Sequence, residues 1–199
     1  MDTAALVLAA GLGTRMGRDK MRIDWQGHPL PAWPVAAAVE AGLSPVIAVL
    51  APGQRTLSAE LEHLGARVAV NPAPEAGMGT SLRYGMAMLT ARSDAVVVLL
   101  GDMPMIRPAL IRQLVEALAP EAGVTIAAPI QDGRRGNPVI FHRTHFPELA
   151  GIMGDKGARD LIQRHQASLR LVETDDPAIH ADLDTPADLD CLARTLSKK

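Results

Sequence analysis

The sequence is poor in cysteine, in aromatic residues and in net charge. Its one cysteine, Cys191, excludes an intramolecular disulfide and a cysteine-rich zinc site. The net charge of −2 argues against a protein that binds nucleic acids or membrane surfaces, because such proteins are basic. Nine methionines stand against two phenylalanines and one tyrosine. This balance predicts a core of aliphatic side chains rather than an aromatic binding platform.

Long apolar runs are also missing. No run approaches the roughly 20 residues that a membrane-spanning helix needs. The segment Met1-Asp2-Thr3 lacks the basic region that begins a secretory signal. From these two features we expect a cytoplasmic protein with no membrane partner.

Short apolar runs recur along the 199 residues and alternate with stretches that have helical periodicity. The expected strands are Ala4–Ala10, Val46–Ala51, Val68–Val70, Ala95–Leu100, Val124–Ala128, Val139–Phe141 and Leu169–Val172. The expected helices are Val35–Ala41, Leu57–Leu64, Ser81–Ala91, Ala109–Leu118 and Arg159–Arg164. Consecutive apolar positions indicate strands buried on both faces. The pattern predicts one domain over residues 1–199, with a mostly parallel sheet in a three-layer, Rossmann-like α/β/α fold.

In such a sheet, ligands bind beyond the carboxyl ends of the strands. The first strand is followed by the segment "LAAGLGTRMGRDK", residues 8–20. Its glycines do not match the dinucleotide pattern, because position 16 is Met rather than Gly. They do not match the P-loop either, because no Gly-Lys-Ser/Thr follows.

The chemistry of this loop nevertheless fits a polyphosphate. Glycines allow backbone N–H groups to converge on an anion. Arg15 can hold a phosphate with two donors, and Lys20 adds a mobile point charge. The alternative is a tight connection whose basic residues are only solvated.

Carboxylates follow two other elements. Asp102 comes directly after the run Ala95–Leu100, where a buried carboxylate is costly unless it is solvated, paired or bound to metal. It is either a turn-forming residue before Pro104 or a Mg²⁺ ligand. Asp184 precedes a predicted helix start in "DLDTPADL", where it either favours the helix dipole or shares the metal. The resemblance of this motif to D-x-D-T-P of nucleotidyltransferases makes Asp182 a further candidate.

Glycines and basic residues gather in three later segments. Gly77, Gly79 and Ser81 form a polar entry to a helix, which can take an anion or serve only as a surface loop. "DGRRGNPVIF" (132–141) and "GDKGARDLI" (154–162) place arginines and a lysine beside glycines, as a second phosphate requires, although both segments could be ordinary turns. His142 and His145, three residues apart without an acidic partner at a telling position, are interpreted as surface or core histidines rather than a metal site.

Together these motifs resemble the nucleotidyltransferases with a GT-A-like fold. The combination L-A-A-G, G-M-G-x-S-L, G-D-M-P, G-R-R-G-N-P-V and G-D-K-G-A-R is similar to the molybdenum cofactor cytidylyltransferase branch, from about Leu8 to about Leu189. The resemblance implies catalytic roles for Lys20, Arg15 and Asp102, and Mg²⁺ held by Asp102 and Asp184. It implies nucleotide binding by Leu8, Ala9, Ala10, Gly11, Gly13, Arg15, Lys20, Gly77, Gly79 and Ser81. It implies acceptor binding by Arg135, Asn137, Lys156 and Arg159.

The implied reaction transfers CMP from CTP to the terminal phosphate of molybdopterin and releases pyrophosphate. Ala10 favours CTP, since guanine users of this family commonly have a second glycine there. The alternatives are a guanylyltransferase acting on the same cofactor, transfer to another phosphorylated acceptor, and a nucleotide-binding regulator without turnover. A molybdoenzyme or its chaperone is the protein partner that the resemblance implies.

Overall fold

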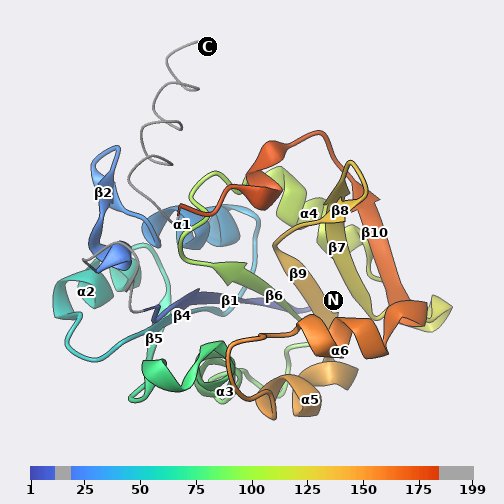
Figure 1. Ribbon diagram of the computed structural model, residues 1–199, viewed down its shortest axis with the longest axis horizontal. Helices are drawn as coiled ribbons and strands as arrows, with labels where there is room; N and C mark the ends of the chain where they lie inside the picture. The colour runs from blue at the N-terminus through green and yellow to red at the C-terminus, as the bar shows by residue number, and fades with distance from the viewer. Residues whose placement is uncertain (12–18, 184–199) are drawn as a thin grey trace.

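The structure is a computed structural model that describes residues 1–11 and 19–183. Within that range it is an α/β fold with a mixed eight-stranded sheet (Figure 1). The strand order is β10-β7-β9-β6-β1-β4-β5, and β8 pairs with β7. The strands are β1 (Thr3–Ala9), β4 (Val46–Leu50), β5 (Arg67–Val70), β6 (Ala95–Leu100), β7 (Ile126–Gln131), β8 (Arg134–Arg135), β9 (Val139–His142) and β10 (Leu169–Glu173).

Helices cover both faces of this sheet, with α1 and α4 on one face and α3, α5 and α6 on the other (Figure 1). The α-helices are α1 (Ala32–Glu40), α2 (Arg55–His63), α3 (Met78–Met86), α4 (Pro108–Ala117), α5 (Phe146–Ala150) and α6 (Arg159–Arg164). Strands β2 (Asp24–Trp25) and β3 (His28–Pro29) form a separate hairpin. The described residues also contain the 3-10 turns η2 (Lys20–Arg22), η3 (Pro74–Ala76), η4 (Pro120–Ala122), η5 (Arg143–His145), η6 (Gln166–Ser168) and η7 (Pro177–His180). The three-layer architecture is confirmed.

The side chains of β1 alternate between two cores because successive residues of a strand point to opposite faces. Ala5 and Val7 pack in the cluster that contains α1 and α4. Leu6 packs in the cluster that contains residues of α3, α5 and α6. Both faces of β1 are therefore buried, which explains its unbroken apolar run.

The sheet is less regular than predicted. Strand β9 runs antiparallel to both of its neighbours, β6 and β7. The pairs β1–β6, β1–β4, β4–β5 and β7–β10 are parallel. The expectation of strands buried on both faces is wrong for β5 and β10, which lie at the two edges. Leu171 in β10 is 44% exposed. An apolar run at an edge therefore does not imply burial.

Candidate functional site

The carboxyl ends of β1 and β6 are held together directly after their last residues. The Gly101 N–H donates to the Leu8 carbonyl over 2.9 Å. A Cβ at position 101 would lie 2.8 Å from the Ala9 Cβ, so only glycine fits this close approach. This contact places Asp102 beside the entry to the glycine-rich loop.

Asp102 forms a buried ion pair with Lys20. Lys20 begins η2, which the Asp19 side chain caps by accepting from the Met21 N–H, and it is 5% exposed. Its Nζ donates to Asp102 Oδ2 over 2.8 Å. Two sequence-predicted catalytic residues, 82 positions apart, are thus in contact.

The second oxygen of Asp102 fits a cation. Oδ1 is buried, and within the described residues it has no hydrogen-bond partner. A buried carboxylate oxygen without a donor is costly, and Mg²⁺ prefers such a ligand. Asp182 is exposed and near, because the following residue, Leu183, donates its N–H to the Asp102 carbonyl over 3.1 Å.

A cleft of about 340 Å³ opens beside this pair. Five of the residues predicted to bind nucleotide line it together with Asp102, namely Leu8, Ala10, Gly11, Gly77 and Ser81. Ala9, Lys20 and Gly79 do not line it. Ala9 is fully buried in the core, and Gly79 packs against the loop that follows α5. This nucleotide cleft is the place where the sequence predicted a triphosphate.

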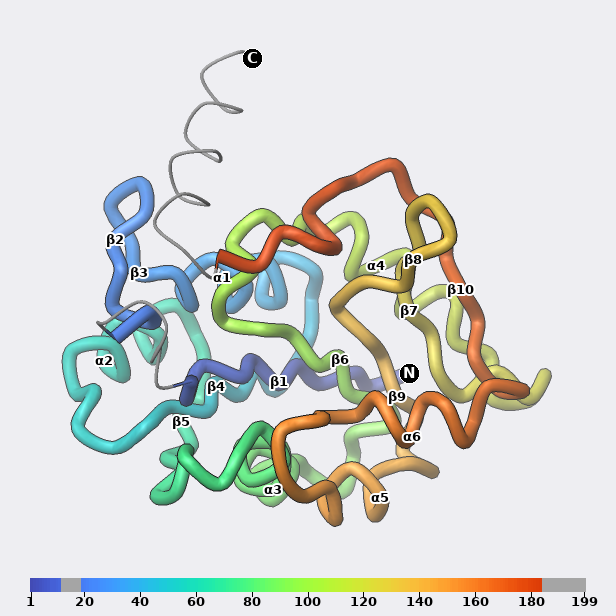
Figure 2. The backbone as a smooth tube through the Cα atoms, viewed as in Figure 1, coloured from blue at the N-terminus to red at the C-terminus, as the bar shows by residue number. Residues whose placement is uncertain are grey.

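The start of α3 is shaped by glycines and one buried amide. Gly77, the residue before the helix, has a φ of +99°, which side-chain-bearing residues rarely adopt. The Gly79 N–H donates to the Gly154 carbonyl over 2.9 Å, so α3 and the loop before α6 lie side by side (Figure 2). Ser81 accepts from Asn71 Nδ2 over 3.0 Å, and Asn71 is fully buried. Ser81 is therefore anchored at the wall of the nucleotide cleft.

A second cleft, of about 520 Å³, contains all four predicted acceptor residues, Arg135, Asn137, Lys156 and Arg159. Leu8, Met78, Leu100 and Asp155 line both clefts, so the two adjoin. Asp182 belongs to this acceptor cleft. The arrangement brings a predicted phosphate-binding group next to the predicted nucleotide site.

The acceptor cleft is positively charged. Arg135 lies in β8, and its Nη1 is buried without a hydrogen-bond partner among the described residues. Burial, and then the charge of Arg159, lower the pKa of Arg135. Two guanidinium groups that repel each other, one with an unsatisfied donor, would both be stabilised by an anion. Lys156 is exposed and pairs with Asp160 over 3.4 Å.

Sequence reasoning missed two residues of the clefts. Asp155 faces both clefts, and its position directly before Lys156 was the available signal. His180 lines the acceptor cleft with a buried Nε2 that has no partner among the described residues. It lies at the end of η7 in a segment without a motif, so no pattern marked it.

Three of the predicted site residues, Gly13, Arg15 and Asp184, lie outside the described residues. Their roles in phosphate and metal binding remain predictions. Cys191, predicted to serve only in packing, also lies there.

Residues 5–169 match the model of the MobA-like NTP transferase domain. The chain belongs to the MobA-like NTP transferase family. The matched region contains every lining residue of the smaller cleft, and all those of the larger cleft except Ile179, His180 and Asp182.

Known relatives agree with this assignment. The chain is 32% identical to the purine catabolism protein PucB of Bacillus subtilis (strain 168), over 96% of this chain and 95% of that protein. The crystal structure of Rv0371c from Mycobacterium tuberculosis H37Rv has a TM-score of 0.83 at 27% identity and covers 98% of both chains. Rv0371c has also been solved in complex with manganese, with a TM-score of 0.79.

In residues 1–11 and 19–183, no helix has the length and apolar character to cross a bilayer.

Proposed function

We propose that this MobA-like transferase moves CMP from CTP to the terminal phosphate of a molybdopterin-type acceptor and releases pyrophosphate. The observation that carries the proposal is the adjacency of two clefts with different chemistry. One is lined by Ala10, Gly11 and Asp102, and the other by three arginines and a lysine. A triphosphate and a phosphate monoester are the ligands that suit these two environments.

The reaction is a displacement at the α-phosphorus. An oxygen of the acceptor phosphate forms a bond to that phosphorus, and the bond from the phosphorus to the bridging oxygen of the β-phosphate breaks. Pyrophosphate leaves with the electron pair. A phosphate monoester is already an anion near neutral pH, so the reaction needs no dedicated general base. The barrier comes from bringing two anions together in line.

Lys20 and Asp102 lower that electrostatic barrier. Lys20 Nζ, held 2.8 Å from Asp102 Oδ2, stabilises negative charge that develops around the α-phosphate. Asp102 Oδ1, which has no hydrogen-bond partner among the described residues, would hold Mg²⁺, with Asp182 or Asp184 as the second carboxylate. The bound metal supplies charge neutralisation between the phosphates. Manganese in the Rv0371c structure supports a divalent cation in this family.

Arg135 and Arg159 serve the acceptor. Their mutual repulsion in a half-buried cleft falls when a phosphate monoester binds between them, and Asn137 adds a hydrogen-bonding amide. This positioning brings the attacking oxygen to the boundary that the two clefts share. The resemblance of the motifs to the molybdenum cofactor branch supports an acceptor of this type.

The test is an activity screen of the purified protein. CTP, GTP, ATP and UTP are each combined with molybdopterin or with a sugar 1-phosphate, and pyrophosphate release is measured. The proposal expects release with CTP and molybdopterin. Preference for GTP would make the protein a guanylyltransferase, and release only with the sugar phosphate would change the acceptor. Nucleotide binding without release under every combination would indicate a regulator.

A further inference from the structure

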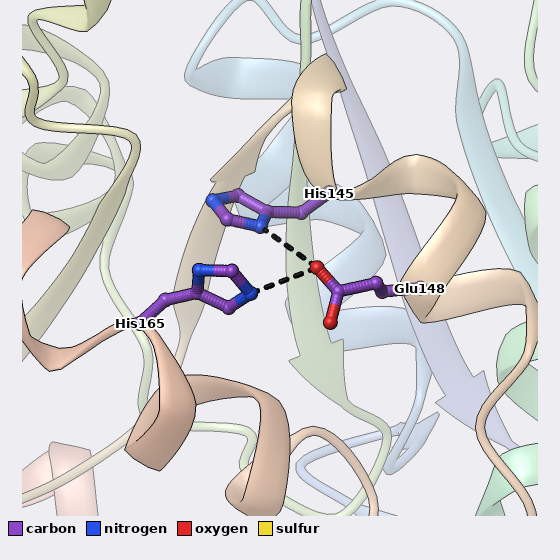
Figure 3. A group of neighbouring side chains, drawn as sticks. All are labelled: His145, Glu148 and His165. Carbon is purple, nitrogen blue, oxygen red and sulfur yellow. Dashed lines mark hydrogen bonds and ion pairs between the residues drawn. The ribbon is translucent and has the colours of Figure 1, made fainter.

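Two histidines and a glutamate converge outside both clefts. His145 Nδ1 and His165 Nε2 both point to the same oxygen, Glu148 Oε1 (Figure 3). The separations from that oxygen are 3.8 Å for His145 and 2.8 Å for His165. All three ligand atoms lie within 4.8 Å of one another. The sequence pattern favoured a surface or core role for His142 and His145 over a metal site, and His142 itself contacts Thr144 rather than this cluster.

The cluster joins separate elements. His145 ends η5, Glu148 follows in α5, and His165 is the residue directly after α6. None of the three lines the nucleotide or acceptor cleft. The cluster therefore has no part in the transferase chemistry proposed above.

Its central observation is an unsatisfied nitrogen. His145 is 5% exposed, and its Nδ1 has no hydrogen-bond partner among the described residues. Its Nε2 lies 2.8 Å from Thr125 Oγ1. When Nε2 donates its proton to that hydroxyl, Nδ1 directs a lone pair at the Glu148 carboxylate. Two acceptors that face each other in a buried place are stabilised by a cation between them.

The charges of the groups agree with this arrangement. Burial, and then the charge of His165, lower the pKa of His145 and favour its neutral form, although Glu148 acts in the opposite direction. A hydrogen bond from Arg164 is the main cause that lowers the pKa of Glu148, and it keeps this carboxylate ionised. Arg164 binds the other oxygen, Oε2, over 2.9 Å. Oε1 thus remains directed at the histidines.

The spacing is close to that of a zinc site. Metal–ligand distances of about 2.0–2.2 Å place tetrahedral ligands about 3.3 Å apart. The two separations from Glu148 Oε1, 2.8 and 3.8 Å, lie on either side of that value. The two histidine nitrogens lie within 4.8 Å of each other, so they must approach by up to about 1.5 Å to complete three ligands, with water as the fourth.

We propose that His145, Glu148 and His165 bind one divalent transition-metal ion of the zinc type. The two nitrogen ligands favour zinc over magnesium, which prefers oxygen. The hydroxyl of Thr125 orients the His145 ring, as the outer partners of metal-bound histidines do. The ion links α5 to the end of α6, the helix whose first residue, Arg159, lines the acceptor cleft.

The first experiment measures binding of Zn²⁺ alone. Untagged protein is stripped with a chelator and titrated calorimetrically, and Co²⁺ is added separately to record its absorption spectrum. We expect one Zn²⁺ per chain and the visible bands of four-coordinate Co²⁺. The same stoichiometry is expected in Asp102→Asn, which separates this site from the magnesium site. Stripped wild-type protein that binds no zinc, or a zinc site that disappears in Asp102→Asn, would overturn the proposal.

The second experiment removes ligands. His165 is half-buried, so His165→Ala is expected to fold, as a circular dichroism spectrum would verify. It should lose at least about 100-fold in zinc affinity, since even outer partners contribute 10–100-fold. Glu148→Gln should lose the Co²⁺ bands, and Thr125→Val should weaken zinc binding at least about tenfold. His142→Ala is the matched control and should bind as wild type. A His165→Ala protein that binds zinc like wild type would refute the site.

Discussion

At the residue scale, the buried pair of Lys20 and Asp102 is the feature that most clearly reports function. Taking both charges out of water costs several kcal/mol each, and the attraction between them only partly offsets this. Such a pair is weak evidence for stability. It lies beside the nucleotide cleft, and one of its carboxylate oxygens has no donor in residues 1–11 and 19–183, so it can serve a ligand as an apolar pair could not.

Asp102→Asn should remove turnover and leave the fold in place. Asparagine keeps an oxygen for Lys20 but loses the charge that holds a divalent cation, so kcat should fall at least about 100-fold, or about 3 kcal/mol. Pyrophosphate release at saturating Mg²⁺ measures this, and circular dichroism checks the fold. The exposed Asp175→Asn is the control. Turnover of Asp102→Asn near the wild-type rate would contradict the metal-binding role.

Ala10→Gly tests the choice of base. Ala10 lines the nucleotide cleft, so its methyl group narrows the space available to a purine. Removing it should raise kcat/KM for GTP relative to CTP by about 10-fold or more, because one methyl contributes about 1–3 kcal/mol of discrimination. Competition between the two triphosphates gives the ratio. An unchanged ratio would mean that the base is selected elsewhere.

Replacing Lys156 and Arg159 together by alanine tests how the two substrates are divided. Both residues line the acceptor cleft and neither lines the nucleotide cleft. The acceptor KM should rise about tenfold or more, while the calorimetric affinity for CTP should stay within a few-fold of wild type. Arg170→Ala, in the edge strand β10, is the control. Loss of CTP binding with unchanged acceptor use would reverse the assignment.

Several site residues could be predicted from the sequence because their chemistry is unusual where they stand. A carboxylate after a buried strand is costly unless it is solvated, paired or bound to metal, and arginines beside glycines suit a phosphate. Asp102 and Arg135 do line clefts. His180 and the partners of His145 could not be predicted. They come together only through tertiary packing, and His165 follows His145 by 20 residues.

At the element scale, periodicity predicted which segments are strands and helices better than how they pair. The helix Arg159–Arg164 has the expected bounds, while α3 spans Met78–Met86 where Ser81–Ala91 was expected. The antiparallel direction of β9 was not predictable, because a buried strand has the same apolar sequence pattern whether its neighbours are parallel or antiparallel to it. The short strand β8 is charged, so its pairing with β7 left no apolar signal.

Gly79→Ala tests the contact between α3 and the loop before α6. A Cβ at position 79 would lie 2.5 Å from the Ile152 carbonyl oxygen, so the helix and the loop must separate. The substitution should lower the free energy of unfolding by about 1–3 kcal/mol. Because this contact borders both clefts, KM should rise for both substrates.

Gly151→Ala is the matched control for that change. It lies in the same loop at a φ of −90°, and its added Cβ would meet its nearest neighbour, the Pro147 carbonyl oxygen, at 3.4 Å. Chemical denaturation and steady-state kinetics on both variants make the comparison. Equal stability of the two proteins would mean that the contact at Gly79 is not tight in solution.

At the scale of the whole molecule, the sheet places two adjoining clefts at the carboxyl ends of β1 and β6. Parallel strands β1 and β6 end at the same place, so the loops after them meet there, while η7 and the loop before α6 add the acceptor side. The nucleotide cleft contacts segments from Leu8 to Asp155, which are distant in sequence. A ligand that touches so many segments stabilises the fold as a unit.

CTP with Mg²⁺ should therefore raise the melting temperature of the whole protein. At a CTP concentration of 100 times Kd, binding to the folded state alone contributes about 2.7 kcal/mol. For a chain of this size that corresponds to a rise of about 5–10 °C. The rise in melting temperature should be smaller in Asp102→Asn, since the cation no longer links the triphosphate to the protein. It should be unchanged in the variant in which Lys156 and Arg159 are alanine. Differential scanning calorimetry measures all three proteins. A wild-type melting temperature that no triphosphate changes would show that the cleft beside Asp102 does not bind nucleotide.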